Sequence, residues 1–330
     1  MQPIRFVSRA LLAPLLLLCA VSGRAGVTVW IPLEIQDGMV LFPVEVGGIT
    51  GHAIFDTGAT GNSVSAALVE KAGLSLAGRR YAIRGTGSTD DIVGSVSSLP
   101  IKLFGIEFKL QDVPALPHDE ELLIGAGFLK AFVLQLDYPN KRMRLITHDS
   151  VDLSKVANVP LRLEESSGRP AIQVTIDGKN RWMLLDTGAS GPIMVRRLIA
   201  EDADWIERFQ RADASIVDIN ASVTNMDLLV LPSVVIGPFE LADVPVMIPA
   251  EGEGINISGV RESGPRNDSN IRKGVRVSGI VGYEILRHFV VTIDYEREKM
   301  HLAAPAEEPK ATAPAPDAAP EQALAPAPAQ

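Results

Sequence analysis

The sequence contains one short pattern twice, and the rest of the chain is arranged around it. The first copy is Ala53-Ile54-Phe55-Asp56-Thr57-Gly58-Ala59-Thr60, and the second is Trp182-Met183-Leu184-Leu185-Asp186-Thr187-Gly188-Ala189-Ser190. In both copies an apolar run leads into Asp-Thr-Gly-Ala and then into a residue with a hydroxyl group. An ionised carboxylate at the end of an apolar strand is costly unless a neighbour compensates it. We therefore expect the fold to bring Asp56 and Asp186 together.

A chance repeat is a weak explanation for this pattern. At average residue usage, a given Asp-Thr-Gly occurs about once in several thousand positions, so two copies with matched flanks are significant. The plain alternative is that each Asp caps an ordinary turn, because Asp and Gly are turn residues and Thr bonds to nearby backbone. A turn explains either copy alone but does not explain the matching apolar strands.

A pair of adjacent carboxyl groups has a definite chemistry. Two carboxylates about 3 Å apart cannot both ionise easily, so they share one proton. The ionised partner can take a proton from a water, and the protonated partner can donate to a substrate carbonyl, which supports hydrolysis of an amide. Gly58 and Gly188 permit close approach of the backbone, and the hydroxyls of Thr57 and Thr187 can bond across to the partner loop.

At these residues the sequence resembles the pepsin and retropepsin superfamily of aspartic proteases, in which each lobe contributes one Asp-Thr/Ser-Gly motif. The resemblance implies that Asp56 and Asp186 are catalytic. The residues that it implies for the supporting loops are Thr57, Gly58, Thr60, Thr187, Gly188 and Ser190. It also implies an all-β fold of two similar β-barrel lobes with short helices and an active-site cleft between them. The implied activity is that of an endopeptidase that acts on a peptide or protein substrate with no cofactor and no metal.

A glycine-rich segment between Tyr81 and Val96 is predicted to be a hairpin. Pepsin-like flaps carry Tyr-Gly-Thr-Gly-Ser, which Gly85, Thr86, Gly87 and Ser88 match, so the resemblance implies a flap over the cleft. Arg84 stands where the Tyr would be, and it cannot reproduce the packing of the ring. A nearby cation would also favour ionised carboxylates and shift the pH range downward. An ordinary hairpin is the alternative.

The second half of the chain repeats the first with an offset that places Asp186 opposite Asp56. Leu123-Ile124-Gly125 matches Ile280-Val281-Gly282, and Asp137-Tyr138 matches Asp294-Tyr295. We therefore expect an N-terminal lobe over 26–150 and a C-terminal lobe over 151–303, with a polar linker from His148 to Pro160. In lobe two, residues 195–209 predict a helix longer than the one in the first copy, and residues 215–225 are the most favoured hairpin, although they lack a strong flap signature.

Both ends of the chain differ from the two lobes. Residues 1–25 have a basic start, a twelve-residue apolar run from Ala10 to Val21 and small residues Gly23 and Ala25, which is typical of a cleaved secretory signal. That run is too short to span a bilayer as a helix, although a retained anchor is the alternative. The Pro- and Ala-rich segment 304–330 predicts a disordered tail, and the glycine-containing segment 251–277 a surface loop or a cleft-edge specificity element. We expect a secreted or periplasmic monomer without a membrane span after signal removal.

Composition excludes several other functions. The formal net charge of −9 becomes more negative once the three arginines of the signal are removed, which argues against nucleic acid as a partner. The only cysteine, Cys19, lies in the signal, so the mature chain has neither disulfides nor thiol chemistry. The five histidines form no metal-binding spacing, and there is no Gly-x-Ser-x-Gly motif. Two rivals of the enzyme remain: a catalytically silent relative that binds peptides, and a surface or adhesion protein built on the same fold.

Overall fold

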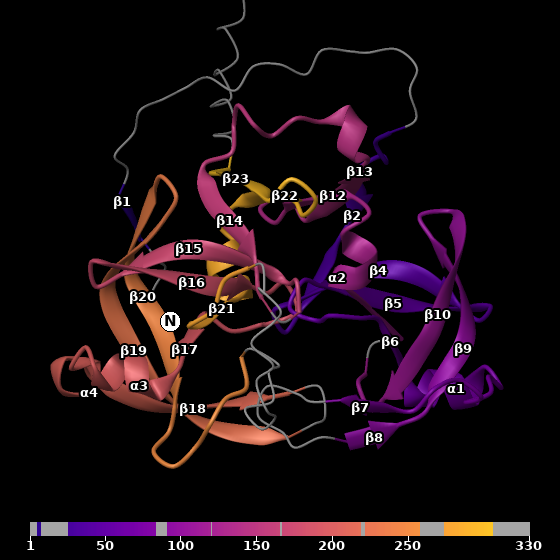
Figure 1. The fold of residues 1–330 in the computed structure, drawn as a ribbon, viewed down its shortest axis with the longest axis horizontal. Helices are drawn as coiled ribbons and strands as arrows, with labels where there is room; N and C mark the ends of the chain where they lie inside the picture. The colour runs from indigo at the N-terminus through magenta and orange to yellow at the C-terminus, as the bar shows by residue number, and fades with distance from the viewer. Residues whose placement is uncertain are drawn as a thin grey trace, which may run out of the picture.

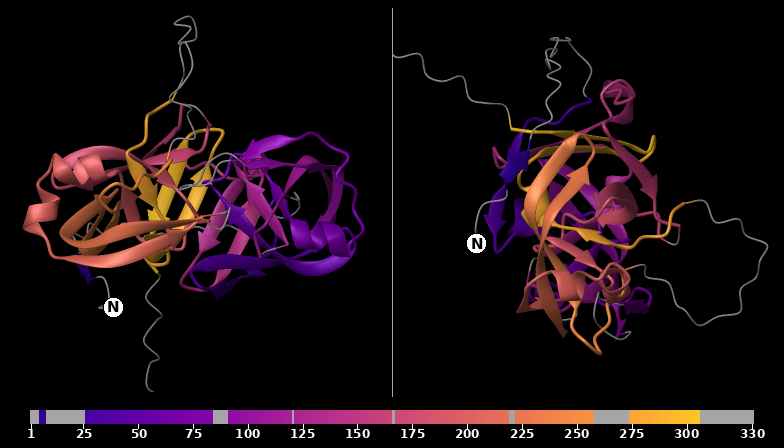
Figure 2. Two further views of the ribbon diagram at one scale, coloured as in Figure 1. Left: turned by 90° about the horizontal axis from the view of Figure 1, so that it is seen from below. Right: turned by 90° about the vertical axis from the view of Figure 1, so that its left-hand side faces the viewer.

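The computed structural model describes residues 5–7, 26–83, 91–119, 121–165, 167–218, 222–257 and 274–305. Strands dominate these ranges, and the five α-helices within them have four to six residues each. Two β-barrels lie side by side, and a further layer of strands lies across both of them (Figure 1; Figure 2). The predicted all-β fold with two similar lobes and short helices is confirmed.

The lobe-one barrel is a sheet that closes on itself. Its strands, in spatial order, are β4 (Met39–Val46), β5 (Ile49–Asp56), β11 (Leu122–Gly125), β6 (Ser63–Ser65), β10 (Ile106–Leu116) and β9 (Ser95–Leu103). Pairing of β9 with β4 closes the barrel, and β3 (Glu34–Gln36) extends β4 at its edge. Apolar side chains such as Phe42, Val44 and Leu99 alternate along the strands and fill the interior, which is the pattern that a barrel of this size requires.

The lobe-two barrel repeats this arrangement strand for strand. The order is β15 (Pro170–Ile176), β16 (Lys179–Leu185), β21 (Gly279–Val281), β17 (Ile193–Val195), β20 (Phe239–Pro249) and β19 (Val223–Ile236). Pairing of β15 with β19 closes it. The turn between β15 and β16 is Asp177-Gly178 with positive φ at both residues, and Gly47-Gly48 does the same between β4 and β5. Turns with positive φ at both central residues match the twist of a two-residue hairpin.

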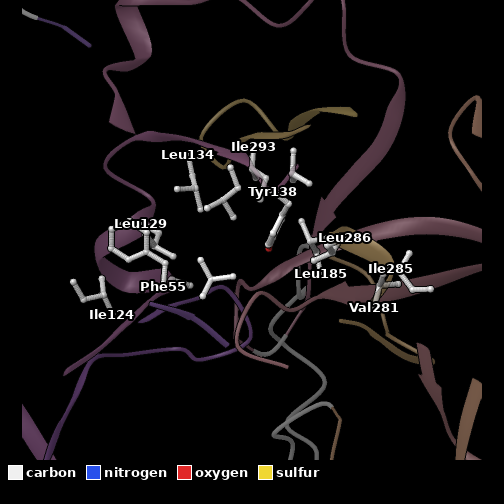
Figure 3. Packing of buried hydrophobic residues seen from close by; sticks show 14 of the residues in the cluster. Phe55, Ile124, Leu129, Leu134, Tyr138, Leu185, Val281, Ile285, Leu286 and Ile293 are labelled. Carbon is white, nitrogen blue, oxygen red and sulfur yellow. The ribbon is translucent and has the colours of Figure 1, made fainter. Parts of the chain in front are cut away.

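A bridging sheet joins the two lobes. Its strands run in the order β14 (Val159–Leu163), β23 (Lys299–Ala303), β22 (Val290–Asp294), β12 (Val133–Asp137), β13 (Arg142–Ile146) and β2 (Ile31–Pro32). At its centre Gln135 of β12 lies opposite Thr292 of β22, and the Gln135 side chain donates a 2.8 Å hydrogen bond to the Thr292 hydroxyl. Apolar residues on the inner face of this sheet, including Leu134 and Ile293, lie above the two barrels (Figure 3). Each lobe therefore supplies half of one continuous layer.

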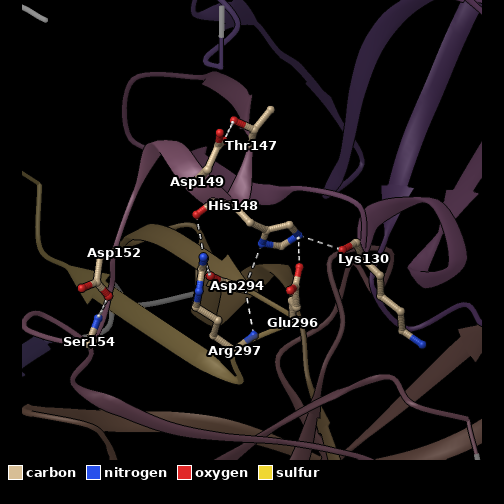
Figure 4. Close-up of polar contacts among 9 residues, drawn as sticks. All are labelled: Lys130, Thr147, His148, Asp149, Asp152, Ser154, Asp294, Glu296 and Arg297. Atoms are coloured by element: carbon tan, nitrogen blue, oxygen red, sulfur yellow. Dashed lines mark hydrogen bonds and ion pairs between the residues drawn. The ribbon is translucent and has the colours of Figure 1, made fainter. Parts of the chain in front are cut away.

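A polar cluster holds the start of the predicted linker against the bridging sheet. His148, in a single turn of 3₁₀ helix (His148–Ser150), lies 3.1 Å from the buried carboxylate of Asp294 and 3.0 Å from the carbonyl of Lys130 (Figure 4). Arg297 donates to the His148 carbonyl and to Asp294. The linker is thus anchored at its first residue, and β14 begins within its last two residues.

The predicted helix over 195–209 is wrong. Ile193–Val195 forms β17, and two short helices follow, α3 (Arg197–Glu201) and α4 (Trp205–Arg208). Asp204 lies between them in the left-handed region with φ 54°, which no α-helix accommodates. Buried Trp205 fixes the second helix against the barrel, and its ring nitrogen donates to Asp177.

Both lobes carry a hairpin on the side opposite the bridging sheet. In lobe one, β7 (Tyr81–Ile83) pairs with β8 (Asp91–Val93), and α1 (Ala66–Lys71) lies near their base (Figure 1). In lobe two, β18 (Arg211–Val217) pairs with β19 as far as Leu229. The two hairpins extend toward each other (Figure 1; Figure 2, left). The prediction of a short hairpin over 215–225 therefore identified only the outer part of a longer one.

Several predictions fall wholly or partly outside the described residues. The flap residues Arg84, Gly85, Thr86 and Gly87 do so, as do most of 1–25, most of the 251–277 loop, and the tail beyond residue 305. Within the first 25 residues, β1 (Arg5–Val7) pairs with β20 at Glu240 to Ala242. None of the helices in the described ranges is long and apolar enough to cross a membrane.

Candidate active site

Matching strands deliver the two aspartates. Asp56 is the last residue of β5, and Asp186 follows β16 directly. A short buried strand runs parallel to each: β11 beside β5, with Gly125 opposite Asp56, and β21 beside β16, with Val281 opposite Leu185. We call residues 56–60 the lobe-one Asp loop and residues 186–190 the lobe-two Asp loop.

The two matching segments Leu123-Ile124-Gly125 and Ile280-Val281-Gly282 pass beside these loops. A Cβ on Gly125 would overlap the carbonyl oxygen of Gly61, and a Cβ on Gly282 would lie 2.5 Å from that of Gly191. After each glycine a short helix begins, α2 (Ala126–Leu129) or α5 (Tyr283–Leu286). The first amide of each helix donates to its Asp loop, Ala126 N to Ala59 O at 2.9 Å and Tyr283 N to Ala189 O at 2.8 Å. Glycine is required at both positions because the loop backbone leaves no space for a side chain.

The two threonines bind the loops to each other across the lobe boundary. The amide of Thr57 donates to the Thr187 hydroxyl at 3.1 Å, and the amide of Thr187 donates to the Thr57 hydroxyl at 3.0 Å. Each hydroxyl in turn donates to a strand carbonyl of the opposite lobe, that of Leu185 or of Phe55. Both threonines are buried, so these bonds form away from competing water. Both threonines hold the two loops in one relative position.

Glycine next to each threonine lets the loops come this close. A Cβ on Gly58 would overlap the carboxyl of Asp186, and a Cβ on Gly188 would lie 2.5 Å from Cγ of Asp56. Each Asp carboxylate also accepts amide bonds from its own loop: Gly58 at 2.7 Å and Ala59 at 2.9 Å for Asp56, and Gly188 at 2.9 Å for Asp186. The structure therefore brings together all six residues of the two Asp-Thr-Gly motifs.

The carboxyl groups of Asp56 and Asp186 lie within hydrogen-bonding reach of each other, and each lies against the glycine of the opposite Asp loop. Burial raises the pKa of Asp56 well above its usual range, and the charge of Asp186 and hydrogen bonding with it raise it further. Burial also raises the pKa of Asp186, but the hydrogen bond from Asp56 and the charge of Arg169 oppose that rise. Each residue keeps some solvent-accessible surface although protein surrounds both carboxyl groups. A pair of this kind holds one proton over a wide pH range.

Sequence reasoning missed three residues next to this pair. Tyr138 and Tyr295 are buried, and the hydroxyl of Tyr138 points from the bridging sheet toward the Asp loops (Figure 3). Burial raises the pKa of both phenols and keeps them neutral; Tyr283 and Asp186 add to the rise at Tyr138, and Asp56 and Asp186 add to the rise at Tyr295. The matched Asp-Tyr pairs were a visible signal for the tyrosines. Arg169, whose guanidinium donates to the carbonyl of Gly58 at 2.8 Å, had no repeated signal because lobe one has no equivalent.

The remaining predicted loop residues lie at the outer end of each Asp loop. Thr60 and Ser190 are both exposed. The carbonyl of Thr60 accepts the amide of Gly127 at 3.2 Å, and Ser190 lies against Gly38 in the turn before β4. Within the described residues, no group of three or more His, Cys, Asp or Glu could hold a metal ion.

The fold and the site place the protein in a class of two-lobed proteins in which each β-barrel contributes one Asp-Thr-Gly loop to a single pair of carboxyl groups. The profile of the aspartyl protease family matches residues 42–128 and 172–285, which is more than half of the chain. The chain belongs to the aspartyl protease family. A comparison with curated protein sequences found no match.

Proposed function

We propose that the protein is an aspartic endopeptidase that hydrolyses peptide bonds with a water activated by Asp56 and Asp186. The observation that carries this proposal is the placement of the two aspartates: each carboxyl group lies against the glycine of the opposite Asp loop, and the two threonines hydrogen-bond the loops to each other. Membership of the aspartyl protease family supports the same reaction class.

The shared proton divides the work between the carboxyl groups. The ionised carboxyl takes a proton from a water as the water attacks the substrate carbonyl carbon, and the protonated carboxyl donates to the carbonyl oxygen. Collapse of the tetrahedral intermediate breaks the carbon–nitrogen bond, and the departing amine receives a proton from the pair. Rigid placement of both acids lowers the barrier because the reacting groups need not be gathered from solution.

The substrate in this proposal is an extended peptide that lies between the lobes, under the β7–β8 and β18–β19 hairpins. Val217 and Val223 pair near the outer end of the lobe-two hairpin and are more than 60% exposed, so they offer apolar contacts to such a peptide. A secreted or periplasmic location, with residues 1–25 removed, belongs to the same proposal. Removal of that segment would take away β1 and free the edge of β20 at Glu240 to Ala242.

A peptide-library digest tests the proposed activity. The purified protein is incubated from pH 3 to pH 7, alone and with a pepstatin-type inhibitor, next to Asp56→Asn and Asp186→Asn. We expect each variant to lose about a thousandfold or more of the cleavage rate, because each removes one partner of the acid–base pair. Asp243→Asn is the matched control, since Asp243 is exposed on lobe two and Asn also adopts its positive φ.

The rival functions have different outcomes in the same experiment. Peptides that bind the wild type and both Asn variants without cleavage at any pH would support a silent peptide-binding protein. Absence of both cleavage and binding would favour the surface or adhesion role. Cleavage that persists in Asp56→Asn would contradict the proposal outright.

A further inference from the structure

Arg169 reaches from lobe two into lobe one beside the aspartate pair, although it belongs to neither Asp-Thr-Gly motif. Its two terminal nitrogens donate to backbone carbonyls, one to Gly58 of the lobe-one Asp loop at 2.8 Å and the other to Ile257 at 2.8 Å. Arg169 directly precedes β15, which pairs with β16, the strand that leads into Asp186. One side chain therefore joins the two sides of the site.

A buried acid holds the guanidinium in this position. The Nε of Arg169 donates to the Ser167 hydroxyl at 2.8 Å, and the Ser167 hydroxyl donates to Oε2 of Glu164 at 2.5 Å. The Ser167 amide donates to the same Glu164 oxygen at 2.8 Å, and Glu164 is only 2% exposed. A planar guanidinium with three of its donors fixed has little freedom to turn away.

Lobe one has no cation at the matching position. Counting from the two aspartates, the residue equivalent to Arg169 is Met39, which packs with Leu41, Ile54 and Leu123. The neighbouring Gly38, at φ 82°, lies against Ser190 of the lobe-two Asp loop. Among the described residues, the near-symmetric carboxyl pair thus has a positive charge from Arg169 of lobe two and none at the matching position of lobe one.

Among the described residues, Arg169, Tyr138 and Tyr295 are the groups outside the Asp loops that interact electrostatically with the aspartate pair. Arg169 interacts electrostatically with Asp186 first, then with Glu164 and then with Asp56. The phenols of Tyr138 and Tyr295, which directly follow two strands of the bridging sheet, interact electrostatically with the pair and are neutral because burial raises their pKa. The one positive charge therefore favours the carboxylate on Asp186 and leaves the shared proton on Asp56.

We propose that Arg169 is a positioning residue that makes the two acids unequal: it keeps Asp186 ionised, keeps the proton on Asp56, and holds the lobe-one Asp loop against lobe two. In the reaction, Asp186 then takes the proton from water and Asp56 donates to the substrate carbonyl. This inference rests on the proposed peptidase function.

The pH profile of kcat/KM on a cleaved peptide tests the charge. The full chain is compared with Arg169→Gln, Arg169→Lys, Glu164→Gln and, as matched control, Arg162→Gln, whose arginine pairs with Glu298 at the surface. Loss of the cation raises the pKa of Asp186, so we expect the acidic limb of Arg169→Gln to move to higher pH by about one unit, with kcat lowered about tenfold or more. Arg169→Lys should restore the acidic limb but not kcat, because Lys keeps the charge without the forked hydrogen bonds.

Glu164→Gln separates the charge from the hydrogen bonds. It keeps an acceptor for Ser167 but removes the negative charge that opposes Arg169, so its acidic limb should move to lower pH. Arg162→Gln should superimpose on the wild type. An acidic limb that stays in place in both Arg169→Gln and Glu164→Gln would overturn the proposal, and if Arg169→Gln does not fold, the sign of the Glu164→Gln shift decides alone.

A second measurement does not depend on cleavage. Carboxyl carbons of ¹³C-labelled aspartate are titrated by NMR, with the resonances of the pair assigned from Asp56→Asn and Asp186→Asn. The proposal expects Asp186 to ionise first in the wild type, and expects the two midpoints to approach each other in Arg169→Gln. Asp56 ionising first would overturn it. A wild type that cleaves no peptide but shows the expected titration would defeat the peptidase proposal and leave the role of Arg169 standing.

Discussion

The two lobes share one barrel but differ in what surrounds it. Six strands follow the same order in both, and the parts that meet at the lobe boundary match closely: the Asp loops, the crosswise threonines, and Gln135 opposite Thr292. The outer parts diverge. Among the described residues, the lobe-two hairpin has more paired positions than the lobe-one hairpin, and lobe two has two helices where lobe one has α1. Residues that pack against their own equivalents are constrained, whereas residues on the outer surface can change independently.

Replacing the glycine of each Asp loop should have the largest effect. Gly58→Ala and Gly188→Ala each place a methyl group where the opposite Asp carboxyl lies. Displacing a reacting group by about 1 Å costs roughly a hundredfold in rate, so we expect at least that loss in kcat/KM for both variants. Gly61→Ala is the control, because nothing lies within 4 Å of a Cβ built there. An active Gly58→Ala variant would mean that the loops are not in contact in solution.

The threonines test whether the lobes contribute equally to their boundary. Thr57→Val removes one hydroxyl and leaves the Leu185 carbonyl and the Thr187 amide buried without their hydrogen bonds. Thr187→Val likewise leaves the Phe55 carbonyl and the Thr57 amide without theirs. Each variant should lower the free energy of unfolding in urea by about 2–5 kcal/mol, the cost of two unsatisfied buried groups. Thr175→Val, whose hydroxyl bonds to Asn180 at the surface, should cost less than about 1 kcal/mol.

The outcome that matters is the difference between Thr57→Val and Thr187→Val. Matched bonds predict losses that agree within about 1 kcal/mol. A larger difference would mean that one lobe depends on the boundary more than the other, as it would if Arg169 already held the lobe-one Asp loop.

The aspartates should differ from each other in their effect on stability. Both have a raised pKa in the folded protein, so below the ordinary value of 3.8 both states are protonated and neither group affects stability. As pH rises above 3.8 the unfolded chain ionises freely and the folded one does not, so stability falls until the folded pKa is passed. Asn mimics the protonated acid, and Asp56→Asn should therefore be more stable than the wild type at pH 7.

Asp186→Asn is the comparison that sharpens this prediction. It removes the charge that faces Arg169, so it should stabilise the protein less than Asp56→Asn does, or destabilise it. Urea unfolding at pH 3 and pH 7 measures both variants, and their gains should disappear at pH 3. A larger gain for Asp186→Asn than for Asp56→Asn would contradict the assigned inequality of the two acids.

The repeat made most of the centre of the molecule predictable from sequence. Both Asp-Thr-Gly motifs, the apolar-apolar-Gly segments and the Asp-Tyr strand ends occur twice, and each occurrence supports the other. A residue that occurs only once beside the aspartate pair left no such signal. Arg169 has no equivalent in lobe one, and its partners Gly58 and Ile257 are far away in sequence, so no local pattern indicates them. The closing pairs β4–β9 and β15–β19 are equally non-local.

The prediction of one helix over 195–209 failed for a local reason, the backbone conformation at Asp204, which the spacing of apolar residues does not reveal. Ile199, Trp205, Ile206 and Phe209 follow a helical period, and periodicity alone favours one continuous helix. The chain instead turns at Asp204, where the short polar side chain tolerates the left-handed conformation. Trp205 follows this turn directly and is fully buried in the core, which a continuous helix through Asp204 would place differently.

Substitution at Asp204 should have the smallest effect and tests this difference between the lobes. Ala in the left-handed region costs about 1–2 kcal/mol, whereas Gly and Asn accept it, so Asp204→Ala should lower the free energy of unfolding by about 1 kcal/mol and Asp204→Gly or Asp204→Asn by less than about 0.5 kcal/mol. Asp202→Ala is the matched control, because Asp202 is exposed and has helical φ and ψ. Equal losses for Ala and Gly would mean that the carboxylate of Asp204 matters and not its backbone conformation. An Ala variant as stable as the wild type would mean that α3 and α4 can merge, and the two lobes would then differ less than the structure indicates.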